Sequence, residues 1–133
     1  MSPSLAGAGP PVQKTVLIAD DEPSMRLLVT ATIASDQIAV LEAADGDEAW
    51  ALIERHRPEL VLLDVQMPGQ TGIELTQRIR SNASLSSTRI VILTSKAQAT
   101  DVASGLAAGA DLYLTKPFSP ISLLAYVAQA LGV

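Results

Sequence analysis

Carboxylate, hydroxyl and amine side chains follow the apolar runs of this 133-residue chain, at the points where the runs end. In chain order they are Asp20, Asp21, Asp64, Thr94, Ser95, Thr115 and Lys116. Carboxylates can act as nucleophiles or hold a divalent cation, while hydroxyl and ammonium groups suit the oxygens of a phosphoryl group. These residue types indicate phosphoryl chemistry if the fold brings them together.

A cluster of three carboxylates needs a compensating cation. Two carboxylates about 4 Å apart repel by about 4 kcal/mol at an effective dielectric constant of about 20. Lys116 offsets part of this repulsion, and a divalent ion offsets more. The available ligands are hard oxygens, which favours Mg²⁺, or Mn²⁺, over Zn²⁺. We therefore expect either Asp20→Asn or Asp21→Asn to stabilise the metal-free fold while weakening metal binding.

Five apolar runs recur at fairly regular spacing and predict the elements that position these side chains. They are "TVLIA" at 15, "IAVLE" at 38, "ELVLL" at 59, "RIVIL" at 89 and "DLYLT" at 111. Most are unbroken, as is typical of strands buried on both faces of a parallel sheet. Segments with helical periodicity lie between and after them, which predicts five helices and an α/β fold with three layers, α/β/α.

The predicted helices have recognisable ends. Pro23 opens the first helix, whose apolar stripe includes Leu28, and Asp45 and Glu48 form a capping-box pair at the second. The third helix carries the apolar positions of residues 73–79, and a weaker fourth helix spans residues 97–109. Ser119 caps the last helix, which includes Leu124 in its apolar stripe. In such folds, ligands bind beyond the carboxyl ends of the strands, so we expect the polar residues to share one rim.

Composition excludes several function classes. The net charge of −5 and scattered basic residues argue against direct nucleic-acid binding. No apolar run approaches the roughly 18 residues that span a bilayer, and no signal peptide is evident, so we expect a soluble, cytoplasmic protein without membrane contact. Residues 1–13, rich in proline and glycine, are predicted to be a flexible tail, and residues 14–133 a single domain.

Four segments in order resemble the receiver domain of two-component response regulators, the CheY-like fold. They are "VLIADDEPSMRLLV", "LVLLDVQMPGQTGIEL", "VILTSKA" and "GADLYLTKPF", and the resemblance covers roughly residues 14–131. It implies a five-stranded parallel sheet of order 2-1-3-4-5. It also implies a phosphorylation-dependent signalling switch that catalyses its own phosphoryl transfer and dephosphorylation but is not a turnover enzyme.

The resemblance also assigns roles within the expected site. Asp64 is the phosphoacceptor, and Thr94 and Lys116 bind the phosphoryl group. Asp21, Asp64 and the backbone carbonyl of Gln66 bind Mg²⁺, with Asp20 acting mainly through water. Thr94 and Tyr113 form the switch, and the Lys116–Pro117 peptide bond is expected to be cis.

The expected partners follow from the same family. A sensor histidine kinase or a histidine phosphotransfer protein donates the phosphoryl group, and a downstream protein binds the face made by helix 4, strand 5 and helix 5. A homodimer through that face is a further expectation. Two alternatives stay open: a receiver-shaped interaction module that is never phosphorylated, and a phosphatase of the haloacid dehalogenase type. The phosphatase is disfavoured because its nucleophile precedes the acidic pair, whereas here Asp20 and Asp21 precede Asp64.

Overall fold

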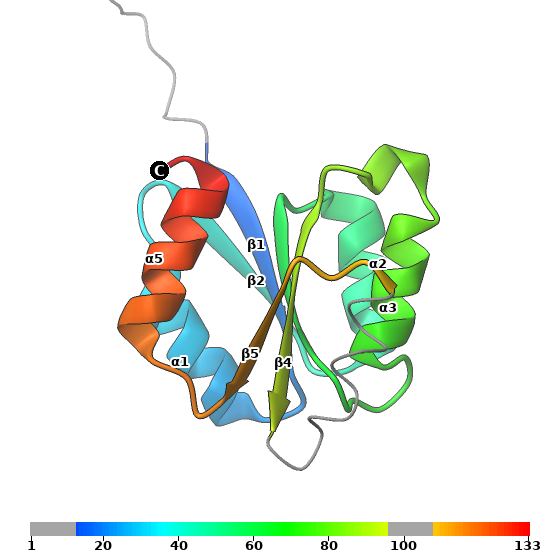
Figure 1. Cartoon of the computed structure of the whole chain (residues 1–133), viewed down its shortest axis with the longest axis horizontal. Coiled ribbons are helices and arrows are strands. Elements are labelled where there is room, and N and C mark those ends of the chain that lie inside the picture. The colour runs from blue at the N-terminus through cyan, green and yellow to red at the C-terminus, as the bar shows by residue number, and fades with distance from the viewer. Residues whose placement is uncertain (1–12, 96–107) are drawn as a thin grey trace, which may run out of the picture.

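Five parallel strands form one sheet in the order β2-β1-β3-β4-β5, which confirms the predicted α/β architecture (Figure 1). The computed structural model describes residues 13–95 and 108–133. The strands are β1 (Lys14–Ala19), β2 (Ile38–Ala43), β3 (Leu60–Asp64), β4 (Arg89–Ser95) and β5 (Leu112–Lys116). Each coincides with one of the predicted apolar runs.

Helices cover both faces of the sheet. They are α1 (Pro23–Ile33), α2 (Gly46–His56), α3 (Gly72–Arg80) and α5 (Pro120–Leu131), with a 3-10 turn at Ala83–Leu85. Figure 1 shows α1 and α5 on one side and α2 and α3 on the other. Four of the five predicted helices are thereby confirmed, and the one predicted over residues 97–109 lies almost wholly outside the described residues.

Alternate residues of the central strands enter two separate hydrophobic cores. In β1, Leu17 packs with the α2 and α3 side, whereas Val16 and Ile18 pack with the α1 and α5 side. β3 and β4 divide in the same way, because successive side chains of a strand point to opposite faces. This two-sided burial explains why the strands appear in the sequence as unbroken apolar runs.

Local signals fix the ends of the helices. Asp45 accepts the backbone N–H of Glu48 (2.8 Å), as predicted, but the Glu48 carboxylate accepts the N–H of Ala44 (2.7 Å) rather than that of Asp45. A complete capping box occurs instead at α3, between Thr71 and Glu74. Each arrangement satisfies backbone donors that have no partner within the helix.

Two leucines depart from the predicted apolar stripes. Leu28 of α1 and Leu124 of α5 are exposed, whereas Val29, Ile33 and Val127 on the same helices are buried. Each of these helices covers its face of the sheet along a narrower stripe than the sequence pattern suggested.

In the described part of the chain, no helix has the length and apolar character needed to cross a membrane. The predicted tail, residues 1–13, lies almost entirely outside the described residues.

Candidate functional site

Strand register brings the predicted site residues to one end of the sheet. Ala19 of β1 is paired with Leu63 of β3, so the residues that follow them, Asp20 and Asp64, lie on neighbouring strands. On the other side of β3, Ser95 of β4 is paired with Lys116 of β5. Parallel pairing therefore places carboxylates, hydroxyls and an amine from four strands at the same edge, as the sequence predicts.

Asp64 occupies the floor of a pocket at this edge. The pocket has a volume of about 370 Å³ and is lined by Asp21, Glu22, Asp64, Gln66, Ser95 and Lys116. Only 6% of the Asp64 surface is accessible, although its side chain contributes to the pocket. A carboxylate that is nearly buried but open on one side can react with a ligand that enters the pocket.

Asp20 and Lys116 form the shortest ion pair of the site. Nζ of Lys116 lies 2.7 Å from Oδ2 of Asp20, which is completely buried, and 3.5 Å from Oδ1 of Asp64. The backbone N–H of Glu22 donates to the other Asp20 oxygen (2.9 Å). Both oxygens of Asp20 thus have partners within the protein, and the ammonium is held beside Asp64.

The charges of this pocket shift the protonation equilibria of two groups. Burial is the main reason that the pKa of Asp64 rises from 3.8 to about 6, with further increases from Asp20 and Asp21 and an opposing effect of Lys116. Burial alone lowers the pKa of the Lys116 ammonium. The hydrogen bond to Asp20 and the charges of Asp64, Asp20 and Glu22 outweigh it, so the pKa is raised. Lys116 therefore stays charged at neutral pH.

The remaining predicted residues lie around this centre. Thr94 is buried at the end of β4, and its hydroxyl donates to the carbonyl of Ser95 (3.2 Å). Gln66 is exposed and lines the pocket. Tyr113 of β5 is half-buried against the core on the α2 and α3 side. The Lys116–Pro117 peptide bond is cis, as expected.

Three residues that sequence reasoning missed also shape the site. The guanidinium of Arg26 donates to the backbone carbonyl of Asp20 (2.8 Å), and the Glu22 carboxylate lies 3.7 Å from Nζ of Lys116. Gly72 opens α3 directly against the backbone of Asp64, so closely that a Cβ would overlap the Asp64 carbonyl oxygen. Neither Arg26 nor Glu22 had a sequence signal, but a glycine before a helical stripe could have suggested close approach for Gly72.

The acidic cluster has the composition of a site for a hard divalent cation. Asp20, Asp21 and Asp64 each offer a carboxylate oxygen, and these oxygens lie within 4.8 Å of one another. Asp21 is exposed, whereas Asp20 already accepts two hydrogen bonds from the protein. Asp21 and Asp64 therefore have the freer oxygens, and an all-oxygen donor set fits Mg²⁺.

Comparison with known proteins agrees with this geometry. Residues 16–128 match the family described as the response regulator receiver domain. The chain belongs to the response regulator receiver family. Membership of this family argues against the haloacid dehalogenase alternative. Receiver domains act as signalling switches in two-component systems.

Individual relatives support the same assignment. The phosphate regulon transcriptional regulatory protein PhoB of Pseudomonas aeruginosa is 40% identical over 86% of this chain and 50% of its own length. The solved structure of the chemotaxis response regulator CheY4 of Vibrio cholerae has a TM-score of 0.81 and 34% identity, covering 90% of this chain and 99% of that one. The BeF3-activated receiver domain of DrrB from Thermotoga maritima has a TM-score of 0.80 and 27% identity, covering 92% of this chain and 100% of that one. The chain spans about half the length of the curated relatives it matches.

Proposed function

We propose that residues 14–133 form a receiver domain whose Asp64 accepts a phosphoryl group from a phosphohistidine. The donor is a sensor histidine kinase or a histidine phosphotransfer protein. The observation that carries the proposal is the placement of a nearly buried Asp64 carboxylate 3.5 Å from the Lys116 ammonium and beside two further acids. The domain is a switch that undergoes one phosphorylation and one hydrolysis per cycle.

The transfer uses an oxygen of Asp64 as the nucleophile. A bond forms between this oxygen and phosphorus, the bond from phosphorus to the imidazole nitrogen breaks, and its electron pair stays on that nitrogen. Lys116 supplies positive charge beside Asp64 for the oxygens of the transferred group. The Thr94 hydroxyl, which donates to the Ser95 carbonyl in the unphosphorylated protein, would donate to a phosphoryl oxygen instead.

A divalent cation, Mg²⁺ or Mn²⁺, fits the proposed function. Asp21, Asp64 and the backbone carbonyl of Gln66 would hold it, and Asp20 would act through water because its own oxygens are engaged. When bound, the ion neutralises negative charge on the phosphoryl oxygens and on the acidic cluster. Ser95 and Gln66, which line the pocket, lie where they can influence the approach of water to the modified aspartate.

The output of the switch is a change in the surface that includes β5 and α5. Tyr113 lies on β5, three residues before Lys116, and is half-buried; in the proposed switch its ring turns inward when Thr94 binds the phosphoryl group. On α5, Ile121 is 82% exposed and Leu124 is 42% exposed, which leaves apolar side chains for a protein target or for a second copy of the chain. Helix 4 of the proposed face lies outside the described residues.

Intact-mass spectrometry tests the phosphoacceptor directly. The wild type is incubated with acetyl phosphate with and without Mg²⁺, beside Asp64→Ala and Asp36→Ala, in which an exposed acid distant from the pocket is removed. We expect one phosphoryl group on the wild type and on Asp36→Ala, only with Mg²⁺, and none on Asp64→Ala. A wild type that neither gains a phosphoryl group nor binds beryllofluoride would favour the unphosphorylated interaction module.

A further inference from the structure

The loop that follows the phosphoacceptor strand, residues 65–71, is fastened to the start of α2. The N–H of Gly46 donates to the carbonyl of Pro68 (2.9 Å). A Cβ on Gly46 would overlap the backbone of Gln70, and a Cβ on Gly69 would lie 2.8 Å from the Asp47 carboxylate. Gly69 also has a φ of 78°, a conformation that favours glycine. The loop thus rests directly on α2.

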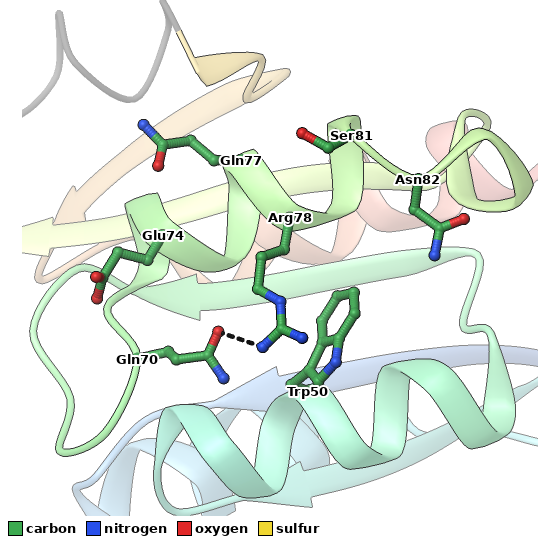
Figure 2. A pocket seen from close by; sticks show the side chains of 7 residues that line it. All are labelled: Trp50, Gln70, Glu74, Gln77, Arg78, Ser81 and Asn82. Atoms are coloured by element: carbon green, nitrogen blue, oxygen red, sulfur yellow. Dashed lines mark hydrogen bonds between the residues drawn. The ribbon is translucent and has the colours of Figure 1, made fainter.

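Side chains extend this attachment to α3. Arg78 of α3 donates from a guanidinium nitrogen to Oε1 of Gln70 (2.9 Å), and Nε2 of Gln70 donates to Oδ1 of Asp47 (3.2 Å). The guanidinium of Arg78 also lies over the ring of Trp50, 4.0 Å from its centroid. Figure 2 shows Arg78 between Gln70 and the Trp50 ring, on the wall of a pocket of about 450 Å³.

This arrangement fixes the orientation of the Gln70 amide. Its oxygen accepts from a cation and its nitrogen donates to an anion, so reversing the amide would lose both bonds. Stacking on Trp50 restricts the guanidinium in turn, because a cation over an indole face is attracted by the ring. Asp47, Gln70, Arg78 and Trp50 therefore form one continuous brace, and Gln70 is its attachment to the loop.

The braced loop also carries Gln66, which lines the acidic pocket. We propose that Gln70 and Arg78 are positioning residues that hold the loop so that Gln66 presents its backbone carbonyl to the divalent cation. Both act through the loop and neither lines the acidic pocket. The inference rests on the metal site of the proposed function, but it concerns residues outside that site.

Trp50 supplies a built-in reporter of the brace. It is the single tryptophan of the chain, and its ring contacts the guanidinium of Arg78, which in turn donates to Gln70. We expect a cation bound by the Gln66 carbonyl to pull on the braced loop and, through Gln70 and Arg78, to shift the guanidinium against the indole. The emission of Trp50 therefore changes on addition of Mg²⁺ in the wild type, and this response is lost when Gln70 is truncated.

Calorimetric titration of the full chain with Mg²⁺ tests the proposal. We expect Gln70→Ala and Arg78→Ala each to weaken Mg²⁺ binding by between about threefold and tenfold. The double variant should bind Mg²⁺ no more weakly than the single variant with the lower affinity, because both substitutions break the same brace. Gln77→Ala is the matched control, since Gln77 lines the same pocket on α3 without belonging to the brace. Urea unfolding of each variant verifies that it is folded.

Gln70→Glu separates positioning from loss of volume. Glutamate keeps an acceptor for Arg78 but meets the Asp47 carboxylate with a like charge, so it weakens Mg²⁺ binding and abolishes the Trp50 response as alanine does. Folded Gln70 and Arg78 variants with wild-type Mg²⁺ affinity and a wild-type fluorescence response would overturn this inference and leave the proposed function unaffected. A wild type that does not bind Mg²⁺ would instead overturn the metal site of the proposed function, and the inference with it.

Discussion

Nζ of Lys116 lies 2.7 Å from Oδ2 of Asp20, a residue 96 positions earlier in the chain. Asp20 is completely buried and the Lys116 side chain is 16% exposed, which makes this pair the main electrostatic link between β5 and the end of β1. The same ammonium lies 3.5 Å from Asp64. Lys116 thus has two tasks, to neutralise a buried acid and to keep a positive charge beside the proposed phosphoacceptor.

Replacement of Lys116 tests the first of these tasks. Lys116→Met leaves the buried Asp20 carboxylate without its cation, so we expect the free energy of unfolding to fall by about 2–4 kcal/mol in the absence of metal. Urea unfolding in a chelator measures this. Lys14→Met at the start of β1 is the control and should change stability by less than about 1 kcal/mol. Equal effects of the two substitutions would contradict the assigned role.

The second prediction concerns Asp20 and Asp21. The sequence predicts that asparagine at either position stabilises the metal-free fold, whereas the structure predicts this only for Asp21. Asp21→Asn removes an exposed charge from the cluster, so we expect the metal-free protein to gain about 0.5–1 kcal/mol of stability and to lose Mg²⁺ affinity. Asp20→Asn instead removes the partner of Lys116 and should not stabilise the metal-free protein. Thermal unfolding with and without Mg²⁺ compares the two, and a metal-free Asp20→Asn variant more stable than Asp21→Asn would refute the argument.

Much of the site could be predicted from the sequence because its side chains follow buried parallel strands. An unbroken apolar run that ends in a polar residue places that residue at the carboxyl edge of the sheet, and this holds for Asp20, Asp64, Thr94 and Lys116. The partner that Lys116 prefers could not be predicted. Several acids share that edge, and the choice depends on side-chain geometry and burial.

Other features lie beyond what sequence periodicity contains. Leu28 and Leu124 fit helical stripes, yet both are exposed, because a stripe does not reveal how much of its width a neighbouring element covers. Arg26 acts through a backbone carbonyl, and Gln70 acts through a loop whose path is fixed by packing on α2. Contacts of this kind depend on the folded backbone and leave no pattern in the sequence.

The pH dependence of stability reports the environment of Asp64. Burial, assisted by the charge of Asp20, raises the pKa of Asp64 from 3.8 to about 6 in the metal-free protein. The folded protein therefore binds this proton more tightly than the unfolded chain does. Its contribution to stability is fully present below pH 3.8 and is lost as the pH rises through about 6.

Urea unfolding of the metal-free wild type and of Asp64→Asn across this range measures the contribution. On going from about pH 4 to about pH 7, the wild type should lose more stability than Asp64→Asn, which has no proton to release at this position. Asp36→Asn, which alters an exposed acid, should follow the wild type. Parallel pH profiles for the wild type and Asp64→Asn would show that Asp64 titrates near its ordinary pKa.

Gly72 offers a test of how the backbone positions the phosphoacceptor. Its N–H donates to the carbonyl of Val65 (3.1 Å), and a Cβ at this position would lie far closer to the Asp64 carbonyl oxygen than side-chain carbons approach. Gly72→Ala must displace either α3 or the end of β3. We expect a loss of about 1–3 kcal/mol in stability and slower phosphorylation of Asp64 by acetyl phosphate.

Gly132→Ala separates these two effects. Gly132 has a φ of 71° at the end of α5, and a Cβ there would meet no described atom within 4 Å. Alanine at this position costs about 1–2 kcal/mol through backbone strain alone, at a distance from the pocket. If Gly132→Ala keeps the wild-type phosphorylation rate while Gly72→Ala loses it at comparable stability, the loss reflects displacement of Asp64. Wild-type rates in both variants would show that the end of β3 tolerates movement of α3 without loss of reactivity.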